Sequence, residues 1–244
     1  MNLLYIASKS LLYLTFDEGN YYDNCEIKIS CPALKFLTYK SPMPKDIVIN
    51  NLFSIEHVNI NFDDYDRNCD EKIGILVHKM IKEAPSISLL KLCKASLKGL
   101  YKEACLSPIC FNKLKSLKLK LGVDEDCMQV MIRLLKYSPN LEVLKLWCDE
   151  MHDPEESIVC LDSHLKSIQL IGFKDEENEI ELIRFFLKNA RVLEKFRIVC
   201  AGYALTSEEA SKKVLNIPTT SSQVLLTFHD AKLKRWSDNW LDNC

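Results

Sequence analysis

The 244-residue sequence has few glycines and no excess of either charge. Its six glycines form no phosphate-cradling loop, and neither a G-x-S-x-G nor an H-E-x-x-H motif occurs. The five histidines share no signature spacing. The sequence therefore predicts a protein that is not an enzyme, with no catalytic residues and no cofactor. A formal net charge of −2 gives no global field that would attract nucleic acid or a membrane.

The sequence also lacks long apolar runs and paired cysteines. No uninterrupted apolar run reaches about 18 residues, and residues 1–10 do not read as a secretory signal. The 11 cysteines include no C-x-x-C pair, and the chain has no N-x-S/T site. These absences favour an intracellular protein, cytoplasmic or nuclear, with reduced thiols. Four cysteines beside predicted strands are expected to pack as small apolar groups, namely Cys31, Cys93, Cys148 and Cys200.

An internal repeat is the main feature that is present. Residues 82–92, 136–146 and 188–198 align without a gap, each with a lysine that ends a helix, then a breaker or, in the third segment, Arg191 in its place, then a strand. The breaker is Pro85 in the first segment and Pro139 in the second, as expected where proline ends a helix. Residues 29–39 form a fourth copy that keeps its proline.

The shared strand pattern is L-x-x-L-x-L, and we call each copy a frame. First positions of the eight frames fall at 11, 34, 55, 87, 114, 141, 165 and 193, so most spacings lie between 21 and 28 residues. This spacing is close to that of leucine-rich repeats. One strand and its return segment cannot bury their own apolar face, so stacked copies share a continuous core.

The predicted fold is therefore an α/β leucine-rich-repeat solenoid, with a curved parallel sheet on the concave face and helices and loops on the convex face. Apolar periodicity predicts helices at about 71–83, 125–137, 176–189 and 206–215, and a last strand at 223–228. Residues 11–62 read as three strands joined by short connections. The first repeat is too apolar to serve as its own cap, so a further segment is expected before it. An uncapped edge would carry a hazard of dimerisation or aggregation, and the sequence does not decide between them.

Three further segments carry a family resemblance. They are CLDSHLKSIQLIGF, NEIELIRFFLKNARVLEKFRI and IPTTSSQVLLTF, all between Cys160 and Phe228. Together they resemble the FBD domain of plant F-box proteins, which follows leucine-rich repeats in that family. The resemblance implies leucine-rich repeats at 1–150, an FBD domain at 151–230 that continues the stack, and a C-terminal tail at 231–244. No segment resembles the F-box itself.

The role implied by the resemblance is recognition of a protein substrate for a cullin-RING (SCF) ubiquitin ligase. A Skp-type adaptor and a cullin are expected partners only if an F-box is supplied upstream. The alternatives are a stand-alone interaction module or a truncated family member without ligase function. A receptor for a small ligand is a further alternative, whereas nucleic acid and membranes are not expected partners.

The binding residues are predicted from strand alternation. The residue between the last two apolar positions of a frame points away from the core. Three frames place lysine there, at Lys91, Lys118 and Lys145, and another places Arg197. With Trp147 as an aromatic anchor, this strip would prefer an acidic or phosphorylated protein. The alternative is that these lysines merely fill a solvated strand face.

Two weaker patterns resemble metal sites. Cys148, His152, Cys160 and His164 have zinc-ligand chemistry but an unusual spacing and no C-x2-C pair. The acidic segment 63–70 resembles the start of a calcium loop but lacks its glycine and its final glutamate. We therefore expect packed cysteines, hydrogen-bonded histidines and a solvated loop, and no metal.

Overall fold

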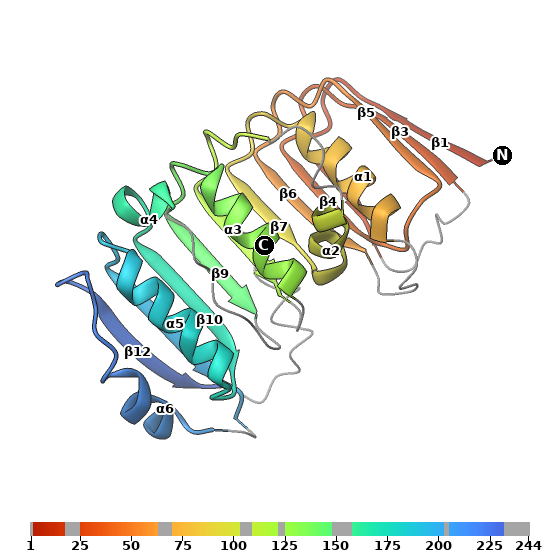
Figure 1. Ribbon diagram of the computed structural model, residues 1–244. Coiled ribbons are helices and arrows are strands. Elements are labelled where there is room, and N and C mark those ends of the chain that lie inside the picture. Colours follow the sequence, from red (N-terminus) through yellow and green to blue (C-terminus); the bar gives the residue numbers. More distant parts are fainter. Residues whose placement is uncertain are drawn as a thin grey trace.

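A nine-stranded parallel sheet is the main element of the computed structural model, which describes residues 2–17, 25–62, 70–102, 109–121, 125–147, 158–202 and 205–231. Its strands follow one another across the sheet in chain order (Figure 1). They are β2 (Tyr13–Phe16), β4 (Phe36–Ser41), β6 (His57–Phe62), β7 (Leu89–Leu92), β8 (Ser116–Lys120), β9 (Val143–Trp147), β10 (Ser167–Phe173), β11 (Lys195–Cys200) and β12 (Leu225–Asp230).

The eight predicted frames are confirmed as strands β2, β4 and β6–β11. From the second frame onward, all three apolar positions are at most 2% exposed. Only the first frame differs, because Leu11 and Leu14 are half-buried. Because side chains alternate along a strand, the apolar positions of successive frames lie on the same side of the sheet and form one shared core.

A second, three-stranded parallel sheet lies beside the N-terminal part of the large one. It consists of β1 (Asn2–Ala7), β3 (Cys25–Ser30) and β5 (Asp46–Asn50), in that order. The sequence reading missed these strands because it searched for the longer L-x-x-L-x-L frame. Their own signal is a short alternation, Ile27 with Ile29 and Ile47 with Ile49, all of which are buried.

Six helices cover the same side of the large sheet, as far as the described residues show (Figure 1). They are α1 (Asp70–Lys82), α2 (Lys94–Lys102), α3 (Glu125–Lys136), α4 (Val159–Ser163), α5 (Glu177–Asn189) and α6 (Ser207–Val214). The four predicted helices are confirmed, whereas the short helices α2 and α4 were missed. None of the described helices is long and apolar enough to cross a membrane.

A repeated turn enters most of the strands. The amide of the first frame residue donates to the carbonyl three residues earlier, for example Leu34 to Cys31 at 3.0 Å and Leu141 to Ser138 at 3.1 Å. The prolines noted in the sequence occupy the second position of such turns, which fits the fixed φ of proline. Each of these prolines therefore fixes the backbone of the turn that leads into the next strand, whether a helix or, at Pro32, a strand precedes it.

A repeated hydrogen bond then joins each repeat to the next. One carbonyl accepts from two consecutive amides of the following repeat; Lys115 O, for instance, accepts from Glu142 N at 3.0 Å and Val143 N at 2.9 Å. Six other carbonyls do the same, at residues 12, 35, 56, 88, 142 and 166. The predicted domain boundary at residue 150 does not interrupt the sheet, because β9 pairs with β10 in parallel.

Candidate binding surface on the outward sheet face

We call the face of the nine-stranded sheet opposite the helices the outward face. Its central row contains the middle outward residue of each strand, and these residues are partners in register from β2 to β12. In chain order they are Thr15, Thr38, Asn59, Lys91, Lys118, Lys145, Gln169, Arg197 and Thr227. The predicted lysine column therefore exists, since Lys91, Lys118 and Lys145 pair directly across β7, β8 and β9.

The exposure of these residues differs from what alternation predicts. Lys91 is only 1% exposed, Lys118 is 8% exposed and Trp147 is 7% exposed. A buried ammonium group needs compensating interactions, because desolvation otherwise disfavours its charge. Alternation gives the face on which a side chain lies but not what packs over it. The binding role of these three residues remains a prediction.

The accessible basic residues of the central row lie toward β11. Lys145 and Gln169 are half-buried, and Arg197 is exposed. Burial is the main cause that lowers the pKa of Lys145, and the charges of Lys118 and Arg197 lower it further. An anion bound beside Lys145 would offset the repulsion from Lys118 and Arg197 and would favour the charged form of the lysine. Arg197 adds five hydrogen-bond donors in a fixed planar geometry that suits carboxylates and phosphates.

The outward positions of the nine strands carry basic residues and no carboxylate. The seven basic residues are Lys40, Lys91, Lys118, Lys120, Lys145, Lys195 and Arg197. This distribution contrasts with the whole chain, whose acidic residues slightly outnumber its basic residues. The positive charge is therefore a local property of one face, which composition alone does not reveal.

Carboxylates do occur where the chain enters the strands, but lysines of adjacent repeats pair with them. Lys35 Nζ lies 3.0 Å from Glu56 Oε1, and Lys166 Nζ lies 3.1 Å from Glu194 Oε1. Lys115 pairs with Glu142 in the same way. These side chains are all substantially exposed, so each pair contributes little stability. Because the two charges of each pair neutralise each other, these carboxylates do not reduce the excess positive charge of the outward face.

An aromatic row at the N-terminal end of the outward face was missed in the sequence. Tyr13 and Phe36 stack with ring centroids 4.5 Å apart, and His57 meets Phe36 edge-on at 4.6 Å. Burial is the main cause that lowers the pKa of His57; Glu56 opposes the shift and Lys118 adds to it. Its signal in the sequence is a ring-bearing residue two positions before the middle outward residue in each of the first three frames.

The two metal-like patterns are not assembled by the described residues. Cys148, His152 and the segment 63–69 lie outside the described ranges. Among the described residues, no group of three His, Cys, Asp or Glu side chains could hold a metal ion. Cys160 is buried, and burial raises the pKa of its thiol to about 12, so it carries a thiol and not a thiolate at neutral pH. The ring of His164 hydrogen-bonds Ser163 Oγ at 2.7 Å.

A buried carboxyl group marks the start of α5. Glu179 is fully buried, and its Oε2 accepts from Lys174 N at 2.9 Å and Glu176 N at 3.0 Å. Burial raises its pKa to about 7 despite these two hydrogen bonds. The sequence showed an acid-rich helix start but not that one acid turns inward. This group stabilises the turn between β10 and α5 and lies on the helix side, away from the outward face.

Taken together, the fold defines an α/β protein of repeated strand units around one parallel sheet, with a basic outward face. Comparison with known proteins shows which proteins the chain resembles. Residues 153–198 match the FBD family model. The chain is 23% identical over 232 residues to a putative F-box/FBD/LRR-repeat protein of Arabidopsis thaliana, covering 86% of this chain and 51% of the relative. It is 25% identical over 243 residues to a second protein of that description, covering 90% of this chain and 52% of the relative.

An FBD-associated F-box protein of the same plant is 24% identical over 198 residues, or 74% of this chain and 42% of the relative. The resemblance stated from the sequence is thus confirmed: the chain carries an FBD segment and is similar over most of its length to F-box/FBD/LRR-repeat proteins. It spans about half the length of these relatives. No solved structure matches it significantly.

Proposed function

We propose that this chain is a non-enzymatic protein-binding module that recognises a protein substrate on behalf of a cullin-RING (SCF) ubiquitin ligase. The names of its relatives indicate a protein-interaction role in the F-box family. In this role the chain supplies proximity and orientation and no bond chemistry. The repeating strand units would form a leucine-rich-repeat solenoid with the outward face as its concave surface.

The observation that carries the proposal is the outward face itself. Nine strands present their middle residues in one register, and the outward positions hold seven basic side chains and no carboxylate; five of the seven remain accessible, since Lys91 and Lys118 are buried. A surface of this kind favours an acidic or phosphorylated protein segment, because attraction between opposite charges speeds the encounter and repulsion between like charges disfavours basic partners. Lys145 and Arg197 are the accessible basic residues of the central row, and Lys120 and Lys195 lie exposed on the same face.

The ligase part of the proposal depends on an F-box. A Skp-type adaptor and a cullin would join only through such a module placed upstream, and this setting implies a cytoplasmic or nuclear location. The second candidate is a stand-alone interaction module without ligase function.

The experiment is affinity purification from plant cells of the tagged chain, alone and fused behind an F-box, with mass spectrometry of the bound proteins. We expect the chain alone to retain one or more proteins without adaptor or cullin. The fusion should retain the same proteins together with adaptor and cullin and should promote their ubiquitination. If the fusion recovers adaptor and cullin but no protein beyond those recovered by the F-box alone, substrate recognition by this chain is wrong. Recovery of the same proteins without ubiquitination would favour the stand-alone module.

A further inference from the structure

Three neighbouring strands of the large sheet, β9, β10 and β11, bring polar side chains of the outward face together. Gln169 of β10 is the register partner of Lys145 in β9 on one side and of Arg197 in β11 on the other. Two residues earlier on β10, Ser167 is the register partner of Lys195. Side chains two residues apart lie on the same face of a strand. Neutral hydrogen-bonding groups on β10 are therefore flanked by cations of both neighbouring strands.

The spacing of these groups suits one small anion. Neighbouring strands lie about 4.8 Å apart, so the Cα atoms of Lys145 and Arg197 are about 10 Å apart, with Gln169 between them. Lysine and arginine side chains are long enough to meet above Gln169 from that distance. Lys145 also lies directly opposite Lys118 in register, and like charges in that position destabilise a sheet. An anion above Gln169 would therefore offset a repulsion that the free protein carries.

No internal partner engages the polar side chains of this group. Within the part of the chain that the structure describes, no hydrogen bond or ion pair involves the side chains of Lys145, Ser167, Gln169, Lys195 or Arg197. The same repeats do supply a carboxylate where the chain enters the strands, since Lys166 Nζ lies 3.1 Å from Glu194 Oε1. The donors of the outward group are thus available to a ligand, whereas the lysine one residue before β10 is already paired.

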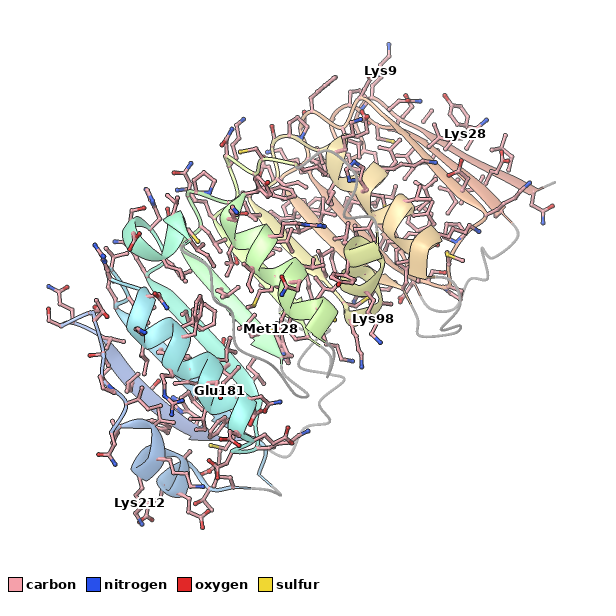
Figure 2. The ribbon with its side chains drawn as sticks, in the orientation of Figure 1. Lys9, Lys28, Lys98, Met128, Glu181 and Lys212 are labelled. Carbon is pink, nitrogen blue, oxygen red and sulfur yellow. The ribbon has the colours of Figure 1, made fainter. Side chains whose placement is uncertain are left out.

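The helix side of the molecule has a different distribution of charge. Figure 2 labels Lys98 of α2, Glu181 of α5 and Lys212 of α6, so both signs occur on the helices. Lys212 pairs within its own helix with Glu208 at 2.9 Å. The outward positions of the strands, in contrast, contain no carboxylate. The cations around Gln169 are therefore a feature of this face and not of the surface in general.

The number of cations and donors favours a phosphate monoester over a carboxylate. A phosphorylated serine or threonine carries about −1.5 to −2 charges at pH 7 and three oxygens that accept strong hydrogen bonds. A carboxylate carries a single charge and two oxygens. One phosphate can accept from Lys145, Gln169 and Arg197 together, and the planar guanidinium matches phosphate in a bidentate way. A single carboxylate would leave most of the positive charge of the group uncompensated.

We propose that Lys145, Gln169, Lys195 and Arg197 form a site for a phosphorylated serine or threonine of the bound protein. The phosphate lies above Gln169, between Lys145 and Arg197, and Ser167 lies beside it on β10. This site rests on the proposed function, because it names the chemical group by which the chain recognises its substrate. Phosphorylation of the partner, and not an acidic sequence alone, then decides whether the partner is bound.

The test measures fluorescence polarisation of degenerate peptide pools that differ only in the central residue, which is phosphothreonine, threonine or glutamate. We expect the purified chain to bind the phosphothreonine pool at least about tenfold more tightly than either other pool. Lys145→Gln/Arg197→Gln should abolish this preference. Arg184→Gln/Lys188→Gln, the same change at exposed positions of α5, should keep it. Equal binding of the three pools, or equal behaviour of the two variants, would overturn the proposal.

A second variant keeps the size of the side chain at the centre of the site. Gln169→Glu places a carboxylate between Lys145 and Arg197, where it should weaken binding of the phosphothreonine pool by about tenfold or more. The thermal midpoint should rise, because the new carboxylate offsets the repulsion between the cations. Gln129→Glu, the same change at an exposed position of α3, should leave the affinity unchanged. An unchanged affinity in Gln169→Glu would contradict a phosphate at this position.

Phosphatase treatment separates this site from the proposed function. If affinity purification recovers the same proteins from plant extract before and after the treatment, substrate recognition is correct and the phosphate site is wrong. If the extract yields no bound protein while the phosphothreonine pool binds as expected, the phosphate site is correct and the proposed function is wrong. Free phosphothreonine or inorganic phosphate that binds as tightly as the pool would assign the site to a small ligand and overturn recognition of a protein segment.

Discussion

The N-terminal and C-terminal parts of the sheet share one inward pattern but differ in what returns the chain to it. Between β1 and β6 the return segments that the structure describes are the strands β3 and β5, whereas between β9 and β12 they are the helices α4, α5 and α6. The inward frames are equally buried in both parts, except in the first repeat. A frame therefore determines a strand of the large sheet. The sequence between two frames determines whether the return segment is a strand or a helix.

The difference also extends to charge. The N-terminal part ends in uncharged edges and an aromatic row on its outward face, and the C-terminal part carries the exposed basic residues and a covering helix. In repeat proteins each unit contacts mainly its neighbours, so the two parts can differ without disturbing one another. Side-chain changes should accordingly have effects that depend on position along the stack.

The largest expected difference concerns the core. Leu144→Ala removes a side chain that is fully buried between neighbouring frames, and we expect a loss of about 3 to 4 kcal/mol in the free energy of unfolding. Leu14→Ala at the half-buried end frame should cost about half as much. Urea denaturation of both variants measures this. Equal losses would mean that the end frame is covered as well as the inner ones.

The next difference concerns Glu179, the buried acid of the C-terminal part. Its folded-state pKa of about 7 lies above the ordinary value of 4.5, so stability present at pH 4.5 is lost as the pH rises through 7. Glu179→Gln keeps an acceptor for the two amides and removes the cost of the buried charge. We expect it to stabilise the protein at pH 8.5 by up to about 3 kcal/mol, and not at pH 4.

The control for this prediction is Glu209→Gln at the start of α6. Glu209 also accepts from the residue that begins its helix, Thr206 N at 3.0 Å, but it is exposed. Hydrogen bonds from Thr206 lower its pKa, so its contribution is present at neutral pH and is lost on acidification. Glu209→Gln should give no gain at pH 8.5. If Glu209→Gln raised the stability at pH 8.5 as much as Glu179→Gln does, burial of the carboxylate would not explain the effect of Glu179→Gln.

A third difference is the response of the N-terminal part to acid. Burial lowers the pKa of His57 and also that of His78 in α1. For a base with a depressed folded pKa, the unfolded chain binds more protons, so stability falls as the pH drops through about 6.5. Acidification should therefore loosen the N-terminal part while it strengthens the turn at Glu179. Hydrogen exchange at pH 7.5 and pH 5.5 measures both regions at once, and parallel changes in the two would contradict the prediction.

The smallest expected effect is that of the exposed ion pairs, which occur in both parts. Lys35→Met breaks the pair with Glu56 and Lys166→Met breaks the pair with Glu194. Each should change the free energy of unfolding by less than about 1 kcal/mol, because exposed pairs are screened by solvent. Thermal unfolding at low and high salt measures this. A larger loss in either variant would show that the pair holds the repeats in register.

How much of this structure the sequence predicts depends on the kind of pattern. The inward frames were predicted residue by residue, since a period of two leaves little freedom in a sheet with a buried face. The second sheet was missed because its alternation, Ile27 with Ile29, is short. The inward turn of Glu179 could not be predicted, because an acid at a helix start normally faces water.

The candidate surface shows the same limit. The register of Lys91, Lys118 and Lys145 follows from alternation alone, and the structure has it as predicted. The burial of Lys91 and Lys118 does not follow, because it depends on packing above the sheet and not on the strand itself. The accessible basic group around Lys145 and Arg197 could be identified only once the exposure of each side chain was known.

The most direct test of binding by the outward face compares two double charge reversals in affinity purification from plant cells. Lys145→Glu/Arg197→Glu changes the outward face, and Arg184→Glu/Lys188→Glu makes the same charge change at exposed positions of α5 on the helix side. Quantitative mass spectrometry should show that the first variant loses its bound proteins by about tenfold or more, while the second retains them. Equal retention by both variants, or equal loss, would contradict recognition through the outward face.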